Sequence, residues 1–327
     1  MKLLIFVHHP FPLWTVPSWF ADRLRKDFPA IHVIHLPDYS RVDAELPDTD
    51  IAVTWTIKPE QVLAARKLRW IHSPAAAVHT LIIPEIIHSD ITITNGRDVH
   101  GPVVAEHVIA LIFALAKKIP EAVRLQQKRE WGQQRMWDEL PRVREVAGAT
   151  VGLIGLGSIG RAVAKSAKAL GMRVIAAREH PEKGSEGADV VFGAAQTDEV
   201  FRAADYVVLA APITQNMTAI ANARRLALMK PDACLINVGR GPLVDHAALA
   251  TALREKKIGG AVLDVFDKEP LASDSPLWDL PNLLITPHTA GLTVKVWERH
   301  YAMYSENLRR YLEGKSLLAV VDKQKGY

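Results

Sequence analysis

The sequence predicts an α/β fold with two doubly wound parallel sheets, one in each of two domains. Short apolar runs alternate with stretches of helical periodicity along nearly the whole chain, and this alternation is typical of parallel strands joined by helices. At 327 residues the chain is long enough for two domains with a core each. One strand–turn–helix unit near the middle of the chain is rich in glycine and the unit that opens the chain is not. We therefore expect the two sheets to bind different ligands.

The first predicted strand, Leu3–Val7, ends in His8-His9-Pro10 and not in a glycine turn. We therefore do not expect this domain to hold a nucleotide. Because no third ligand stands at a familiar spacing from the two histidines, no metal site is predicted. The other strands expected in this domain are Ile31–Leu36, Ile51–Trp55, Trp70–His72 and Ile91–Thr94, with helices over Trp19–Leu24 and Glu60–Lys67.

Small side chains follow the strand Trp70–His72, in the segment Ser73-Pro74-Ala75-Ala76-Ala77-Val78. Such a segment leaves backbone N–H groups accessible, which suits the capture of a carboxylate. Ala76, Ala77 and Val78 are therefore the candidate substrate-binding residues. A tight turn without a ligand is the alternative.

A long apolar stretch, Val103–Ala116, predicts a buried helix that ends at Lys117-Lys118-Ile119-Pro120. The next 25 residues, 121–145, are charged and rich in Gln, and they contain Trp131, Met136 and Trp137. Aromatic side chains in a polar arm indicate a contact between subunits. Ordinary packing against the same chain is the competing interpretation.

The glycines stand in one βαβ unit. The apolar strand Thr150–Ile154 runs into Gly155-Leu156-Gly157-Ser158-Ile159-Gly160, and a helix and a second strand follow. Gly155 permits the tight turn, Gly157 lets the backbone approach a pyrophosphate, and Gly160 lets the helix pack closely on the strand. The helix N-terminus offers its unpaired N–H groups to the phosphates. We therefore predict a Rossmann domain that binds a dinucleotide; a purely structural glycine turn is the alternative.

The second strand of this unit, Arg173–Ala177, ends at Arg178. A carboxylate is expected near this point to hold the ribose 2′-hydroxyl of NAD, whereas an arginine suits the 2′-phosphate of NADP. Arg178 therefore favours NADP(H). Glu179 keeps NAD(H) open, because a shift of one residue would restore an acid at this point.

Three short apolar strands and a fourth near residue 284 complete the second sheet, and ligands of such sheets bind beyond the carboxyl ends of the strands. The segments at these ends are Ala211-Pro212-Ile213-Thr214, Gly239-Arg240-Gly241, Asp264-Val265-Phe266 and Thr286-Pro287-His288. The strands are Tyr206–Ala210, Ala233–Val238, Gly260–Leu263 and Leu283–Ile285, and the helices are Asn222–Met229, His246–Lys256 and Val294–Glu313.

Arg240, Glu269 and His288 all lie just beyond strand ends, at the edge where a nicotinamide is expected. Together they supply what reduction of a 2-oxo acid requires. A guanidinium can bind the carboxylate and polarise the carbonyl group. An imidazole can donate and accept the proton, and a neighbouring carboxylate holds it in its protonated form. Each residue alone also has a structural explanation, as a helix-cap ion pair, a loop charge or a core histidine.

These segments resemble the D-2-hydroxyacid dehydrogenase family, and the resemblance covers nearly the whole chain. It implies a flavodoxin-like substrate-binding domain of residues 1–98 and 289–327, a Rossmann domain of residues 99–288, and a cleft between them that closes on the substrate. It also implies a homodimer through the cofactor domains and a place for Asp264 near the nicotinamide carboxamide. The motifs are Gly155–Gly160, Ile236–Asp245, Leu263–Pro270 and Thr286–Gly291. They add Ser158, Ile159, Val238, Gly239, Ala290 and Gly291 to the cofactor-binding residues, and the strand-end segment adds Ala211 and Pro212.

Two segments depart from the family pattern. Ala77 and His79 stand where the family usually has Gly and Asp, which changes the substrate loop. Arg178 replaces the usual acid, as in NADPH-using members that resemble glyoxylate/hydroxypyruvate reductases. Glu269 argues against formate dehydrogenases, which have Gln as the partner of the histidine. The sequence shows no C-terminal extension of the kind found in the long phosphoglycerate dehydrogenases.

Composition excludes other classes of protein. No run of about 18 apolar residues is present, so no membrane span is predicted. The net charge of +4 could attract anionic ligands, but the basic residues are scattered, so no nucleic-acid partner is expected. A single cysteine, Cys234, lies within an apolar run, which fits a cytoplasmic protein without disulfides.

The sequence therefore predicts an NADPH-preferring reductase of a small 2-oxo acid such as glyoxylate or hydroxypyruvate. Two alternatives remain open at this point. One is an NAD-linked enzyme that oxidises D-2-hydroxy acids. The other is a dinucleotide-sensing scaffold that resembles the corepressors with this fold, although such a scaffold has no need of Arg240, Glu269 and His288.

Overall fold

The computed structural model describes residues 1–326, so Tyr327, the last residue of the predicted substrate domain, lies outside the described residues. The chain forms two compact units, of which unit 1 is Met1–His100 with Thr293–Tyr327 and unit 2 is Gly101–Leu292. The sequence placed these boundaries at 98/99 and 288/289. The later second boundary has a physical reason, because Ala290 is 3% exposed and belongs to the apolar core of unit 2.

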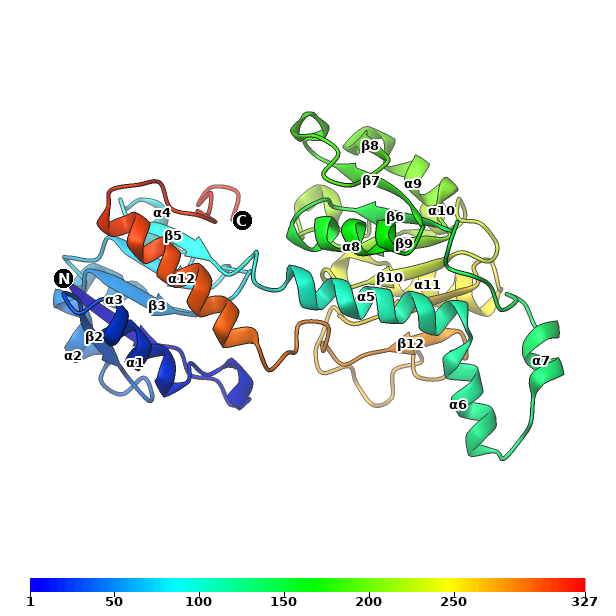
Figure 1. The fold of residues 1–327 in the computed structure, drawn as a ribbon, viewed down its shortest axis with the longest axis horizontal. Helices are drawn as coiled ribbons and strands as arrows, with labels where there is room; N and C mark the ends of the chain where they lie inside the picture. Colours follow the sequence, from blue (N-terminus) through cyan, green and yellow to red (C-terminus); the bar gives the residue numbers. More distant parts are fainter. Residues whose placement is uncertain (327) are drawn as a thin grey trace. The chain divides into compact units, whose positions relative to one another are not determined.

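Within the described residues, unit 1 contains a five-stranded parallel sheet in the order β2-β1-β3-β4-β5. This is the flavodoxin-like order. Figure 1 shows its elements, which are β1 (Lys2–Phe6), η1 (Pro12–Trp14), α1 (Ser18–Asp27), β2 (His32–His35), α2 (Val42–Glu45), η2 (Leu46–Asp48), β3 (Ile51–Thr54), α3 (Pro59–Ala64), β4 (Trp70–Ser73), α4 (Pro84–Ile87), β5 (Thr92–Asn95) and α12 (Val296–Leu312).

Successive residues of β1 enter opposite cores of unit 1, since side chains alternate along a strand. Leu3 and Ile5 pack with α1 and α12, whereas Leu4 and Phe6 pack on the face covered by α2, α3 and α4. The helix α12, near the C-terminal end of the sequence, therefore covers one face of the first sheet together with α1.

Unit 2 contains, among the described residues, a seven-stranded parallel sheet in the order β12-β11-β10-β9-β6-β7-β8. The strand order reverses between β6 and β9, as in the Rossmann fold. The elements are α5 (Gly101–Ala116), α6 (Ile119–Gln127), α7 (Gln133–Asp138), β6 (Thr150–Ile154), α8 (Ser158–Ala169), β7 (Arg173–Arg178), η3 (Pro181–Lys183), β8 (Val190–Gly193), η4 (Ala194–Gln196), α9 (Thr197–Ala203), β9 (Tyr206–Leu209), η5 (Gln215–Met217), α10 (Ala223–Leu226), β10 (Cys234–Asn237), η6 (Gly241–Leu243), α11 (His246–Arg254), β11 (Gly260–Leu263) and β12 (Leu283–Ile285).

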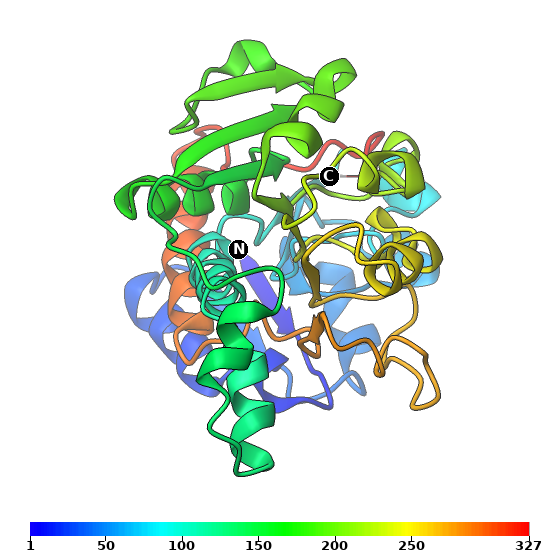
Figure 2. The ribbon, with the colours of Figure 1, turned by 90° about the vertical axis from the view of Figure 1, so that its right-hand side faces the viewer.

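Helices cover both faces of this sheet, as Figure 2 shows for α5 and α8 on one side and α11 on the other. Along β9, Tyr206 and Val208 face the core formed with α5 and α8, and Val207 and Leu209 face the core formed with α9 and α11. The predicted α/β class with two doubly wound parallel sheets is confirmed.

Several predicted elements differ from the observed ones at their ends. The helix predicted over Asn222–Met229 is a single turn, α10, and the strand β8 was not predicted. All four residues of β8 are only half-buried, because it is an edge strand, so its apolar signal is short. Among the described residues, no helix is long and apolar enough to cross a membrane.

The segment after α5 forms an arm made of α6 and α7, which extends from unit 2 in Figures 1 and 2. Trp131 is 92% exposed and Trp137 is 55% exposed, while Met136 is half-buried. Packing within the chain therefore leaves Trp131 almost uncovered, whereas Arg142 lies over the ring of Trp137 at 5.2 Å.

Candidate active site

The turn between β6 and α8 requires two of its glycines for reasons that the structure makes visible. Gly155 has φ +97°, a conformation that L side chains rarely adopt. A Cβ on Gly160 would lie 2.2 Å from the carbonyl oxygen of Gly155, so only glycine lets α8 pack this closely on the turn. Gly157 differs, because a Cβ there would meet no described atom within 4 Å.

The open space at Gly157 lies at the N-terminus of α8, a helix of 12 residues. Among the described residues, no side chain caps this end and no acidic residue stands in its first turn. The N–H groups of the first turn, which begins at Ser158 and Ile159, therefore point at a site without competing negative charge. This arrangement fits the phosphates of a dinucleotide.

The neighbouring strand ends border the same turn. Gly155 packs on the backbone of Ala210 and Ala211, which follow β9, and a Cβ at Gly239 would lie 3.0 Å from the carbonyl oxygen of Ala211. Pro212 is exposed beside them, and Val238 is buried. The structure thus places these predicted cofactor-binding residues at the point where the strand order reverses, which is where ligands bind in such sheets.

Arg178 is the last residue of β7, and its side chain is 13% exposed. Its Nη1 atom donates a hydrogen bond to Oε2 of Glu186 at 2.7 Å. Glu186 also pairs with Arg161 of α8, since Oε1 lies 3.5 Å from Nη1 of that arginine. The sequence did not indicate Glu186, because nothing in its spacing from Arg178 marks a contact.

Arg240 lies in a turn that Asn237 braces from within the sheet. Asn237 is fully buried, its Oδ1 accepts from the Gly239 N–H at 3.1 Å, and its Nδ2 donates to the Arg240 carbonyl at 2.9 Å. The Nη1 of Arg240 donates to the Gly239 carbonyl at 2.7 Å. Burial lowers the pKa of the Arg240 guanidinium, and the charge of Glu269 opposes this shift.

Gly241 brings this turn against the loop that carries Glu269. A Cβ on Gly241 would lie 2.0 Å from the carbonyl carbon of Phe266, so the two backbones are in direct contact. Glu269 is held in the same loop, because its Oε1 accepts from the Phe266 N–H at 2.9 Å. Close packing of the two loops thus positions a guanidinium and a carboxylate near each other.

Glu269 and His288 form a hydrogen-bonded pair, with 2.6 Å between Oε2 and Nδ1. An ionised carboxylate can only accept, so with Glu269 charged Nδ1 carries the proton in this bond and Nε2 is the nitrogen left to exchange a proton with a ligand. The side chain of His288 is 57% exposed, so Nε2 is accessible. This geometry is that of a general acid–base group with an orienting partner.

His288 adopts a left-handed backbone conformation, with φ 52°. Such a conformation costs a residue other than glycine about 1 to 3 kcal/mol and tends to occur at functional sites. Its N–H donates to the Asp264 carbonyl at 2.9 Å, which ties the segment after β12 to the segment after β11.

Asp264 is 1% exposed, and its carboxylate accepts hydrogen bonds from groups of the protein itself. It accepts from the N–H groups of Thr289 at 2.9 Å and Ala290 at 3.1 Å and from the hydroxyl of Thr286. His107 of α5 lies 3.7 Å away through Nε2 and also contacts Thr286. Asp264 therefore shapes the loop that contains His288, and Gly291 follows in the same loop. The sequence did not indicate His107.

In unit 1 the segment after β4 is shaped by β5. Asn95, which is buried, donates from Nδ2 to the Ala76 carbonyl at 2.7 Å. Ala76 and Ala77 are half-buried and Val78 is buried. Among the described residues, the backbone N–H groups of these three residues donate to no protein acceptor. They are thus available to an anion.

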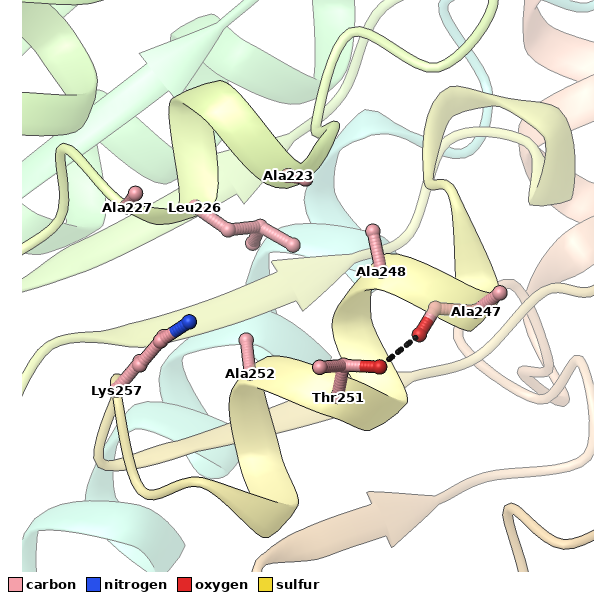
Figure 3. A pocket seen from close by; sticks show the side chains of 8 residues that line it. All are labelled: Ala223, Leu226, Ala227, Ala247, Ala248, Thr251, Ala252 and Lys257. Carbon is pink, nitrogen blue, oxygen red and sulfur yellow. Dashed lines mark hydrogen bonds between the residues drawn. The ribbon is translucent and has the colours of Figure 1, made fainter.

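A surface pocket of about 300 Å³ lies elsewhere in unit 2, between α10 and α11 (Figure 3). The Thr251 hydroxyl donates to the Ala247 carbonyl at 3.1 Å, and Lys257, which pairs with Glu255 at 2.6 Å, is the charged residue of the lining. None of the predicted site residues lines it. The lining residues are Ala223, Leu226, Ala227, Ala247, Ala248, Thr251, Ala252 and Lys257. Within residues 1–326, no group of three His, Cys, Asp or Glu side chains is arranged to hold a metal ion.

The parallel strands β6, β10, β11 and β12 have their carboxyl ends at one edge of the sheet of unit 2. This edge carries the glycine turn, Arg240 and the Glu269–His288 pair. Fold and site together define a dinucleotide-dependent oxidoreductase.

Comparison with known proteins agrees with this class. The family model for the D-isomer specific 2-hydroxyacid dehydrogenase NAD binding domain matches residues 109–290. The glyoxylate reductase of Thermococcus gammatolerans is 33% identical over 321 residues, which cover 95% of this chain and 94% of that protein.

Solved structures are similar over the full length. The D-isomer specific 2-hydroxyacid dehydrogenase of Xanthobacter autotrophicus, in complex with NADPH and MES, has a TM-score of 0.84 at 28% identity and covers 100% of this chain and 99% of its own. The NADPH-dependent glyoxylate/hydroxypyruvate reductase of Sinorhizobium meliloti, in complex with NADP and sulfate, has a TM-score of 0.81 at 27% identity with the same coverage. The chain belongs to the D-isomer specific 2-hydroxyacid dehydrogenase family, and it is an oxidoreductase that binds a nicotinamide dinucleotide.

Proposed function

We propose that this protein reduces a small 2-oxo acid, of the glyoxylate or hydroxypyruvate type, to the D-2-hydroxy acid, with NADPH preferred over NADH. The observation that carries this proposal is the 2.6 Å hydrogen bond between Glu269 and His288 at the strand edge that also bears the glycine turn. The similarity to glyoxylate reductases supports the substrate class.

Each residue of the site has a role in this proposal. When bound, the reduced dinucleotide supplies a hydride. Arg240 binds the substrate carboxylate and polarises the carbonyl group, because its partly buried guanidinium is a strong donor in a setting of low dielectric constant. His288 gives the Nε2 proton to the carbonyl oxygen. Glu269 keeps the ring oriented through Nδ1 and stabilises its positive charge.

For the backbone N–H groups of Ala76, Ala77 and Val78 in unit 1 we propose the binding of a carboxylate. Their lack of protein acceptors among the described residues supports this role. Ala77 and His79, which depart from the family pattern, then define the shape of the loop that selects the substrate side chain.

The preference for NADPH rests on Arg178 at the end of β7, where a guanidinium suits the 2′-phosphate. The complexes of two related structures with NADPH or NADP agree with this preference. We further propose a homodimer through unit 2, because the arm of α6 and α7 exposes Trp131 and Trp137 to solvent in the single chain.

A panel of 2-oxo acids, assayed with NADPH and with NADH, tests the function. We expect kcat/KM to be highest for glyoxylate or hydroxypyruvate with NADPH, and Arg178→Asp to reverse the cofactor preference. Equal use of both cofactors by the native protein would contradict the role of Arg178. Light scattering of the native protein and of Trp131→Ala tests the dimer, which the substitution should weaken.

A further inference from the structure

Glu186 stands between two guanidinium groups in the loop that connects η3 to β8. Its Oε2 accepts from Arg178 at 2.7 Å, and its Oε1 lies 3.5 Å from Nη1 of Arg161. The three side chains are 29%, 13% and 42% exposed for Glu186, Arg178 and Arg161, respectively. The carboxylate of Glu186 thus pairs directly with Arg178.

The backbone conformation of Glu186 is unfavourable and does not by itself account for the position of this side chain. Glu186 has φ 44°, a left-handed conformation that costs an L residue about 1 kcal/mol or more. The contacts of its carboxylate with the two guanidiniums offset that cost. Gly187, which directly follows Glu186, and Gly184, which precedes Ser185, both have positive φ as well.

Arg178 occupies the position at the end of the second strand where the 2′-substituent of the ribose is recognised. A guanidinium that donates to a carboxylate presents the same donors to a phosphate monoester, which carries more charge and has three acceptor oxygens. A 2′-phosphate bound at Nη1 of Arg178 would therefore take the hydrogen bond that Glu186 accepts from this atom.

We propose that Glu186 is a specificity-determining residue that competes with the 2′-phosphate of NADP for Arg178. This inference rests on the proposed function and adds the residue that sets the balance between the two cofactors. A nucleotide with a 2′-phosphate must displace the carboxylate, whereas a nucleotide with a 2′-hydroxyl binds with the pair intact. Glu186 thereby reduces the advantage that Arg178 gives to NADPH.

The test uses the full-length protein and the adenine halves of the two cofactors, 2′,5′-ADP and 5′-AMP, titrated by calorimetry. Glu186→Gln keeps the size of the side chain and removes its charge. The matched control is Glu182→Gln, which removes the same charge from η3, just before this loop, where Glu182 pairs with His180 at 3.1 Å. We expect Glu186→Gln to lower the dissociation constant of 2′,5′-ADP by about fivefold, which is the effect of one surface ion pair. The control and the affinity for 5′-AMP should change less than twofold.

Unchanged binding of 2′,5′-ADP to Glu186→Gln, or an equal gain in Glu182→Gln, would overturn the proposal. The second outcome would mean that the loop acts only through its net charge. Circular dichroism at matched concentration verifies that both variants are folded. Failure of the proposed function would look different, because the native protein would then bind neither adenine nucleotide or would reduce no 2-oxo acid with either cofactor.

Discussion

Glu269 and His288 are 19 residues apart in the sequence, yet Oε2 of one lies 2.6 Å from Nδ1 of the other. The contact exists because β11 and β12 are neighbours in the sheet, so the loops after them meet. The bond assigns the proton of Nδ1 and leaves Nε2 for chemistry. The first two predictions follow from this pair.

Replacing His288 with Asn should lower kcat by about 1,000-fold, the usual contribution of a general acid. Asn tolerates the left-handed conformation of residue 288, so the loop should keep its shape. Steady-state assays with glyoxylate measure kcat, and fluorescence titration measures the dissociation constant of NADPH. The dissociation constant of NADPH should stay within about twofold, and turnover at the native rate would refute the role of His288.

Replacing Glu269 with Gln should lower kcat by about 100-fold without loss of stability. The amide oxygen can still accept from the Phe266 N–H, but the amide NH₂ would then face Nδ1 and favour a neutral ring. Steady-state kinetics measure the loss of kcat, and a thermal unfolding curve of the same sample shows whether stability is retained. A kcat within threefold of the native value would show that the charge of Glu269 is not required.

The glycine turn offers a matched pair of substitutions. Gly157→Ala adds a methyl group where no described atom lies within 4 Å, so stability should be unchanged while the affinity for NADPH falls at least tenfold. Gly160→Ala places a methyl group 2.2 Å from the Gly155 carbonyl, so the unfolding free energy should fall by about 1 to 3 kcal/mol. Urea unfolding and NADPH titration of both variants check this. An unstable Gly157→Ala would mean that the space at this glycine is structural.

Acid should destabilise unit 1 through His72. This side chain is 1% exposed, and burial lowers its pKa to about 3. Burial also lowers the pKa of His300 well below its ordinary value. The unfolded chain binds a proton near pH 6.5 that the native His72 does not, so the stabilisation is complete above about pH 6.5 and is lost as the pH falls toward 3.

For one histidine the limiting slope is about 1.4 kcal/mol per pH unit. Urea unfolding at pH 7, 6 and 5 measures it. His72→Asn should be less stable at pH 7, because the ring also bonds Thr94, but its stability should fall less steeply with acid. Parallel curves for the native protein and the variant would exclude His72 as the titrating group.

Much of the fold follows from local sequence. The apolar run Thr150–Ile154 and its glycine turn predicted β6 and the start of α8, because the backbone conformation of Gly155 and the close packing at Gly160 demand that residue type. The edge strand β8 and the single turn α10 were less predictable, since short, half-buried elements have weak periodicity. Strand ends located Arg240, Glu269 and His288 on one edge, but their roles stay predictions until the variants are assayed.

By itself, the sequence determined the class of the fold, the dinucleotide turn and the residue types at the strand ends, because these depend on periodicity and on the steric needs of glycine. Only the tertiary structure decided which of those residues touch. The hydrogen bond of Glu269 to His288, the packing of Gly241 on Phe266 and the ion pair of Glu186 with Arg161 join segments whose separation depends on strand order. Periodicity along a chain carries no record of strand order, so contacts of this kind arise only when the sheet is assembled.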